Sequence, residues 1–274
     1  MTRRQNALSS VSDSRQKQTN DILDITQKVE FHLQTNGVYI HKNTLYDLWK
    51  DTSSSWYTKA LAYWDDQVTC PADHDGILGG FGHVNEMDIE GSKHFLRHLK
   101  MKNHQRTFSQ AIDMGAGIGR VAKQVLMSIC TDVDLLEPSP RLLQASRTYV
   151  GNSHTGTFYG LGLHQIDQLP KERKYDLIWC QWVLVHLTDV DMIAFLLHCK
   201  NLISSTGLLI VKENLVAKED VFDIDHLDSS ISRSALYYES LFMQGGWTIL
   251  YDKDCPEFPT ELYPVHFYAL TPTL

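Results

Sequence analysis

A glycine-rich loop follows the first strongly apolar strand of this 274-residue chain. The loop runs from Asp113 to Arg120 (DMGAGIGR), and a helical pattern begins directly after it. Glycines here let the backbone turn sharply and approach a ligand, and a helix N-terminus offers free amide groups. The alternative is a tight strand-to-helix turn without a ligand. The loop predicts a nucleoside-cofactor site that includes Asp113, Gly115 and Gly117.

The spacing of the glycines argues against NAD or FAD as the cofactor. A dinucleotide fingerprint, Gly-x-Gly-x-x-Gly, requires glycine at position 120, where this chain has Arg120. The observed Asp-x-Gly-x-Gly-x-Gly pattern instead resembles that of class I S-adenosylmethionine-dependent methyltransferases.

A carboxylate stands at the end of the second predicted strand. Glu137 follows the apolar run Val133–Leu136, where it can accept hydrogen bonds from both hydroxyls of a ribose. A later strand, ending near Trp182, projects over the same crevice. These strand ends predict one cofactor crevice at the carboxyl edge of a sheet.

Short apolar strands alternate with helical patterns from residue 110 onward, which predicts an α/β fold: a Rossmann-like, seven-stranded methyltransferase sheet with helices on both faces. The expected strands are 110–114, 133–136, 157–160, 176–180, 208–211, 248–252 and 265–270. The expected helices are 119–127, 141–149, 191–200 and 234–244. The last connection has no helical pattern, so we expect the final strand to be antiparallel.

Three segments are predicted along the chain. Residues 1–18 are too polar to form a core and are expected to be a disordered tail. Residues 19–55 form an N-terminal helical extension, because apolar positions recur at helical spacing. Residues 56–274 form the catalytic domain.

Composition narrows the partners. With 25 Lys and Arg against 33 Asp and Glu, the net charge of −8 disfavours nucleic acid and favours cationic partners. No membrane-length apolar run and no leader peptide are visible, so we expect a soluble, monomeric protein of the cytoplasm or nucleus. The five cysteines suggest reduced thiols. His94 and His98, without an acidic third ligand, predict surface histidines and no metal site.

Five motifs together closely resemble the family of protein N-terminal methyltransferases that modify Xaa-Pro-Lys termini. They are Leu78–His83 (LGGFGH), the glycine loop, Ile178–Asp189 (IWCQWVLVHLTD), Val211–Asn214 (VKEN) and Asp228–Ser230 (DSS). The similarity extends from about Tyr57 to Leu270. It implies methylation of the α-amino group of Xaa-Pro-Lys/Arg protein tails, exposed after removal of the initiator Met, with S-adenosyl-L-homocysteine as the second product.

The resemblance also implies residue roles. Cofactor contacts fall on Gly115, Arg120, Glu137, Ser139, Leu163, His164 and Gln181. Arg120 is expected to pair with the methionine carboxylate. Relatives more often have Asp, Thr and Gln at the positions of Glu137, Ser139 and His164; only the last change adds a titratable ring.

On the acceptor side, the nucleophile must be a neutral amine, whereas a free α-amino group has a pKa of about 8. A base that takes its proton therefore raises the reactive fraction. Asp228 and His186 are the candidate bases, and Asn214 and Gln181 the candidate neutral contacts for alignment.

Aromatic and acidic residues suit the rest of such a tail. Trp182, with Tyr63 and Trp64, is expected to pack against the proline ring. Asp225 and Asp228 are expected to bind a third-position Lys or Arg. Tyr263 is a candidate hydrogen-bond donor, and Leu78, Gly79 and Ser230 lie in the family motifs.

Blander interpretations exist for the same residues. Tyr63 and Trp64 could be ordinary core aromatics, and His186 a buried structural histidine. A small-molecule amine as the acceptor is an alternative, because one fold serves many substrates. A catalytically silent cofactor-binding scaffold is another, but the glycine loop and the Asn214, Asp228 and His186 set are intact.

Overall fold

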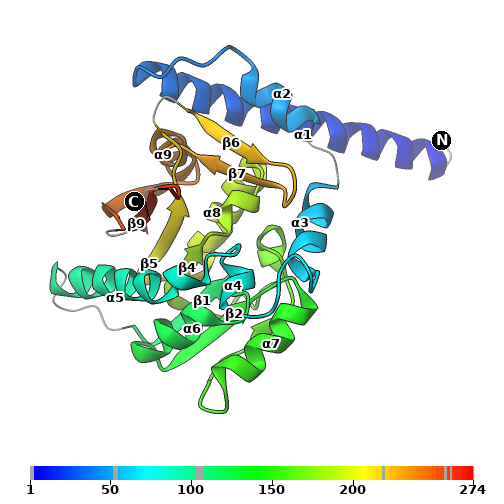
Figure 1. Cartoon of the computed structure of the whole chain (residues 1–274). Helices are drawn as coiled ribbons and strands as arrows, with labels where there is room; N and C mark the ends of the chain where they lie inside the picture. The colour runs from blue at the N-terminus through cyan, green and yellow to red at the C-terminus, as the bar shows by residue number, and fades with distance from the viewer. Residues whose placement is uncertain are drawn as a thin grey trace.

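The computed structural model describes residues 3–51, 55–102, 108–217, 220–255, 258–259 and 261–273, without the side chains of residues 3–16, 51 and 100–102. A seven-stranded sheet lies at its centre (Figure 1). The strands are β1 (Gln110–Met114), β2 (Asp132–Leu136), β3 (Phe158–Tyr159), β4 (Tyr175–Gln181), β5 (Ile203–Asn214), β8 (Trp247–Asp254) and β9 (Val265–Pro272).

The sheet order is β3-β2-β1-β4-β5-β9-β8. The first five strands are mutually parallel, and β9 runs antiparallel to both of its neighbours. This confirms the predicted fold class and the antiparallel last strand. The chain reverses its direction of winding between β1 and β4, which is where doubly wound sheets open a crevice for ligands.

Helices cover both faces of the sheet. The helices are α1 (Arg3–Thr35), α2 (Thr44–Asp51), α3 (Trp56–Asp65), α4 (His74–Ile77), α5 (Asn85–Lys102), α6 (Arg120–Gln124), α7 (Pro140–Val150), α8 (Asp189–Leu202) and α9 (Ala235–Gln244). Apolar residues of α1, α8 and α9 share one core with one face of the sheet. Residues of α5, α6 and α7 share the core on the other face.

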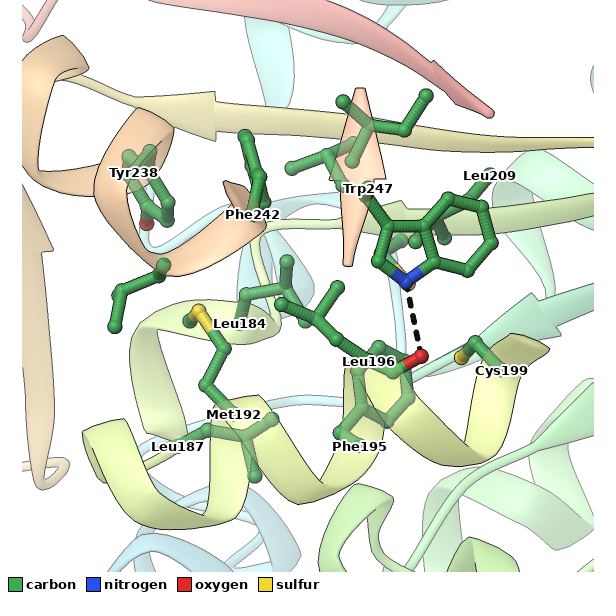
Figure 2. Close-up of a cluster of buried hydrophobic side chains, with 14 of the residues drawn as sticks. Leu184, Leu187, Met192, Phe195, Leu196, Cys199, Leu209, Tyr238, Phe242 and Trp247 are labelled. Atoms are coloured by element: carbon green, nitrogen blue, oxygen red, sulfur yellow. Dashed lines mark hydrogen bonds between the residues drawn. The ribbon is translucent and has the colours of Figure 1, made fainter. Parts of the chain in front are cut away.

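The core between α8 and the sheet is closely packed (Figure 2). Its largest residue on β8 is Trp247, whose indole nitrogen donates a hydrogen bond of 2.9 Å to the Leu196 carbonyl. Helix α8 begins with Thr188 as its N-cap, accepting from the Asp191 amide, and Asp189 and Asp191 complement the positive end of the helix. The Thr188 cap thus sets the start of α8, three residues after the predicted base His186.

A second, two-stranded sheet was not predicted. It consists of β6 (Phe222–Asp225) and β7 (Ser230–Arg233), paired antiparallel. The turn between them holds Asp228 and Ser229, and Ser229 adopts a left-handed conformation with φ of 54°. Polar residues alternate with apolar ones in both strands, but four residues are too few for the pattern to stand out.

The N-terminal segment begins with a long helix. Helix α1 begins at Arg3, because residues such as Gln, Lys, Arg and Ala have adequate helix propensity without forming a core. Its later part packs Ile25, Val29 and Leu33 into the main core. The predicted boundaries at residues 18 and 55 stay predictions.

Candidate active site

A cavity of about 1400 Å³ opens at the carboxyl ends of β1, β2, β4 and β5, at the topological switch point. It brings together most of the predicted site residues. The predicted cofactor contacts that line it are Asp113, Gly115, Gly117, Arg120, Glu137, Leu163, His164 and Gln181. The predicted acceptor-side residues that line it are Trp64, Leu78, Gly79, Trp182, His186, Asn214, Asp228, Ser230 and Tyr263.

Three predicted residues do not line the cavity, each for a local reason. Ser139 is fully buried as the N-cap of α7, where its hydroxyl accepts from the Leu142 amide and donates to Asp65. Asp225 is exposed, and its carboxylate caps the β6–β7 turn by accepting from the Leu227 amide at 2.7 Å. Tyr63 packs edge to face against Trp64, with ring centroids 5.3 Å apart.

The glycine loop is held in place by the carboxylate at the end of β2. Glu137 accepts from the amides of Gly117 at 2.9 Å and Ser139 at 2.8 Å. Burial raises the pKa of Glu137 to about 7, and the Asp113 and Asp65 charges add to this. A ribose that offers two hydroxyl donors would find the acceptor here that the sequence predicted.

Gly115 touches the next strand end. Its φ is +76°, and a β-carbon added to it would lie 2.3 Å from Cγ2 of Val183. Asp113 connects the start of the loop to α6, because its carboxylate accepts a hydrogen bond from the Ala122 amide at 2.9 Å. Burial raises the pKa of Asp113 to about 7. The loop therefore has one geometry, fixed by β1, by α6 and by the segment after β4.

Arg120 is part of a buried ion network that the sequence did not predict. Its guanidinium donates to Asp88 at 2.5 Å, and Lys212 donates to the same carboxylate. Gln181 adds its amide at 3.0 Å to both Asp88 oxygens. Although burial favours the neutral acid, the Lys212 and Arg120 charges hold the pKa of Asp88 below its usual range.

This network carries a surplus positive charge. Two cations, Arg120 and Lys212, face one carboxylate, and all three side chains are at most 5% exposed. An unbalanced buried charge is costly unless a partner neutralises it. A ligand carboxylate at Arg120 supplies that partner, so the residues fit the methionine end of S-adenosylmethionine. The predicted Arg120 role stays a prediction, and the structure adds Asp88 as its partner.

His164 also lines the cavity. Its ring stacks on Tyr57, with centroids 4.2 Å apart and 18° between the planes. Partial burial lowers the pKa of His164, with Asp191 acting in the opposite direction. The neutral form of this ring is thereby favoured.

His186 has one ring nitrogen committed to the protein backbone. Its Nδ1 lies 3.1 Å from the Ser229 carbonyl oxygen, which can only accept, so Nδ1 carries the proton. Nε2 of the neutral ring then bears a lone pair. Burial lowers the pKa of His186, although the Asp228 charge opposes the shift. The ring is therefore in the form that can accept a proton.

Asp228 offers an unsatisfied acceptor. Its Oδ1 is buried and has no hydrogen-bond partner among the described residues. Because a buried polar atom without a partner is costly, this oxygen fits a ligand donor such as an ammonium group.

A side-chain hydrogen bond connects Trp182 to Asn214. The Trp182 indole donates to Oδ1 of Asn214 at 3.0 Å, which orients the amide. Trp182 itself has a left-handed backbone, with φ of 51°, a conformation uncommon outside glycine and often found at functional sites. Its ring forms part of the cavity wall.

Sequence reasoning missed several residues. Glu213 lies in the VKEN motif, but the sequence suggested no role for it. It is fully buried and accepts hydrogen bonds from the amides of Val183 and Leu184. Burial raises the pKa of Glu213 to about 8. Charged Lys212 and Glu213 inside an apolar strand were the available signal. Asp88 had none, because Lys212 lies 124 residues away. Three further carboxylates that line the cavity are Asp220, Asp223 and Glu261.

No metal site accompanies this chemistry in the described residues, where no cluster of three or more His, Cys, Asp or Glu side chains could hold an ion. The five cysteines are free and buried. Within the same residues, no helix is long and apolar enough to cross a membrane. The sheet order, the glycine loop, the carboxylate after β2 and the cationic end of the cavity define a class I S-adenosylmethionine-dependent methyltransferase.

Comparison with known proteins gives the family. The family model described as AdoMet-dependent proline di-methyltransferase matches residues 52–271. The chain is 37% identical to an N-terminal Xaa-Pro-Lys N-methyltransferase 1 of Danio rerio, over 80% of this chain and 97% of that protein. It is 37% identical to an alpha N-terminal protein methyltransferase 1 of Schizosaccharomyces pombe, over 79% and 96%.

Solved structures agree. A SAM-dependent methyltransferase from Leishmania major is 38% identical, with a TM-score of 0.72 over 79% of this chain and 83% of that one. The N-methyltransferase NodS from Bradyrhizobium japonicum, 14% identical with a TM-score of 0.54 over 69% of this chain and 98% of that one, shows the shared fold alone. The chain belongs to the AdoMet-dependent proline di-methyltransferase family, which confirms the predicted family and cofactor.

Proposed function

We propose that this enzyme methylates the α-amino group of protein N-termini of the Xaa-Pro-Lys/Arg type after removal of the initiator Met. The observation that carries the proposal is the buried Oδ1 of Asp228, which has no hydrogen-bond partner among the described residues and lies in the same cavity as His186. Relatives whose names specify Xaa-Pro-Lys N-termini support it.

The two candidate bases have different tasks in the proposed reaction: Asp228 attracts the charged amine and His186 accepts its proton. The Asp228 carboxylate attracts the α-ammonium group, which is the charged form of the amine below about pH 8. The Nε2 lone pair of His186 is suited to accept a proton from it, because Nδ1 is already bonded to the Ser229 carbonyl. The amine then keeps a free electron pair for attack.

Bound S-adenosylmethionine supplies an electrophilic methyl group. The protein has to hold the neutral amine in line with that methyl and keep water away. Trp182 and Trp64 form apolar walls of the cavity that suit a rigid proline ring. The Asn214 amide, oriented by Trp182, is the candidate donor to the peptide backbone.

The acidic part of the cavity suits the third residue of the tail. Asp220, Asp223 and Glu261 line it together with Asp228. Asp223 is tied to Tyr263, whose hydroxyl donates to it at 2.5 Å. We propose this group of carboxylates for the third-position Lys or Arg, in place of Asp225, which does not line the cavity.

The test is mass spectrometry of peptides incubated with the pure enzyme and S-adenosylmethionine. A Ser-Pro-Lys peptide is expected to gain methyl groups at its N-terminus. The same peptide with an acetylated N-terminus is the matched control and is expected to stay unmodified. Methylation of the acetylated peptide on an internal lysine, or of small amines only, contradicts the proposal.

Other properties rest on the sequence. A monomeric state and a location in the cytoplasm or nucleus stay predictions. The absence of nucleic-acid partners is a prediction that the net charge of −8 supports.

A further inference from the structure

The N-terminal extension lies outside the segment that the family model matches, which begins at residue 52. It is nevertheless built into the molecule. Ile25, Val29 and Leu33 of α1 are buried in the main core, and α1 contacts both α8 and α9. Figure 1 shows α1 and α2 lying across the end of the molecule that carries α9 and the β6–β7 hairpin.

Trp49 of α2 reaches the chain segment that carries His186. Its indole nitrogen donates to Oδ2 of Asp189 at 2.7 Å, over 140 residues of sequence. Trp49 is 3% exposed and Asp189 is fully buried. The extension therefore supplies one of the hydrogen bonds that satisfy a buried carboxylate three residues after the candidate base.

The same carboxylate anchors Arg233, which holds the main chain around His186. Arg233 donates to Oδ1 of Asp189 at 2.9 Å and to the Leu187 carbonyl at 2.7 Å. Its second nitrogen lies 3.4 Å from the Leu184 carbonyl. These two carbonyls flank His186, so the Trp49–Asp189–Arg233 network determines where the histidine stands.

A second contact concerns Trp56 at the start of α3. Its indole donates to the His186 carbonyl itself at 2.8 Å. The rings of Trp49 and Trp56 meet edge to face, with centroids 5.9 Å apart. Both rings belong to a small core with Ile231 of β7, and that core also includes Ile22, Leu48, Phe222 and Ile224. The hairpin that carries Asp228 thus rests on the extension.

We propose that the extension, through Trp49 and the small core, is a positioning element for the two candidate bases, His186 and Asp228. Trp49 is a positioning residue, since it acts through Asp189 and Arg233 and does not line the cavity. The physical reason is that a base displaced by about 1 Å can lose on the order of a hundredfold in rate. The inference rests on the proposed function of His186 and Asp228.

Trp49→Phe tests the hydrogen bond while keeping an aromatic ring in the small core. In the full-length enzyme with an Xaa-Pro-Lys peptide, we expect kcat to fall by about tenfold or more. The peptide KM and the cofactor Kd are expected to change by less than about twofold, because the groups that bind both ligands are intact. Trp247→Phe is the matched control, since it removes an equally buried indole hydrogen bond, the one drawn in Figure 2, and neither Trp247 nor its partner Leu196 lines the cavity. It is expected to keep kcat.

A double-mutant cycle with His186→Ala separates positioning from general destabilisation. If Trp49 acts through the histidine, Trp49→Phe lowers kcat by less than about twofold once His186 is already absent. A full, multiplicative loss in that background overturns the inference, and so does a wild-type kcat in folded Trp49→Phe. Wild-type kcat in the single variant His186→Ala identifies a failure of the proposed base and is read independently of Trp49.

Should Trp49→Phe not fold, Ile22→Ala provides the second test, because it only shortens one side chain of the small core beneath the hairpin. We expect it to lower kcat in the wild-type background and to have a smaller effect once Asp228 is replaced by Asn. Unchanged kcat in folded Ile22→Ala overturns the support of the hairpin by the extension.

Discussion

Lys212 and Asp88 form an ion pair in which neither side chain has any exposed surface. Lys212 also donates to Oγ of Ser92 at 3.1 Å, and Asp88 binds Arg120 on its other oxygen. The pair therefore lies directly behind the arginine that we expect to receive the cofactor carboxylate, and leaves that arginine only partly neutralised.

Lys212→Met is expected to weaken cofactor binding. Without Lys212, the negative charge of Asp88 is balanced by the positive charge of Arg120. The network then has no surplus positive charge to attract the cofactor carboxylate. We expect the Kd of S-adenosylhomocysteine in calorimetry to rise by about tenfold, equivalent to ~1.4 kcal/mol. Lys93→Met, on the same helix as Asp88 but in a partly exposed pair with Glu90, is the control. An unchanged Kd in folded Lys212→Met contradicts the charge argument.

The pH dependence of turnover reports on His186. Its neutral form is the base, so kcat falls as the pH drops through the histidine pKa. Because burial lowers that pKa, the acidic limb of the wild-type profile lies below the ordinary pKa of histidine. His186→Ala is expected to lose about 10²- to 10⁴-fold in kcat at neutral pH.

A partial recovery is expected in His186→Ala above about pH 8, where the free amine is already neutral. The measurement is a pH–rate profile of kcat for both proteins. If His186→Ala has the same pH–rate profile of kcat as the wild type, the His186 ring has a packing role and is not the base.

Asp228→Asn and Asp225→Asn make a matched pair. Asp228 has a buried oxygen without a partner in the cavity, whereas Asp225 is exposed at the hairpin turn. We expect Asp228→Asn to lower kcat by about a hundredfold and to raise the peptide KM, because it removes both the base and a charge near the third residue. Asp225→Asn is expected to change neither by more than about threefold. Steady-state kinetics that show the reverse order would restore the acidic pocket predicted from the sequence.

Gly115→Ala addresses the cofactor loop. The methyl group would lie 2.3 Å from Val183, and φ is +76°. We expect the free energy of unfolding to fall by about 2–4 kcal/mol from strain and overpacking, and cofactor binding to be lost as the loop shifts. Gly37→Ala is the control, since φ is +80° there and the added β-carbon has nothing within 4 Å. Its expected cost is strain alone, about 1–2 kcal/mol. Equal melting temperatures for the two variants would contradict the steric argument.

The sequence predicted the large sheet well for a physical reason. Parallel strands buried on both faces appear as short apolar runs, and glycine and carboxylate residues at their ends fall at one edge whatever the loops do. Asp113, Gly115 and Glu137 were found this way. The β6–β7 hairpin escaped because strands of four residues leave no clear period, so Asp225 was placed in the cavity instead of Asp223.

The buried networks of charged side chains could not be predicted from the sequence either. Asp88, Lys212 and Arg120 come from α5, β5 and α6, and no local pattern connects them. The bond from Trp49 to Asp189 spans 140 residues and equally depends on tertiary packing. Pairings of this kind follow only from knowing which elements are neighbours.

The strands of the hairpin that carries Asp228 pair with each other, and the isolated β-bridge described outside this pairing joins Arg233 to Leu215. The glycine loop and Glu137, in contrast, belong to the large sheet. The hairpin carboxylates that we propose for the third tail residue and the cofactor contacts thus lie on different sheets. We therefore expect substitutions at residues 220–227, which leave Asp228 in place, to change which N-termini are accepted without changing cofactor binding, and this segment is a suitable target for laboratory evolution.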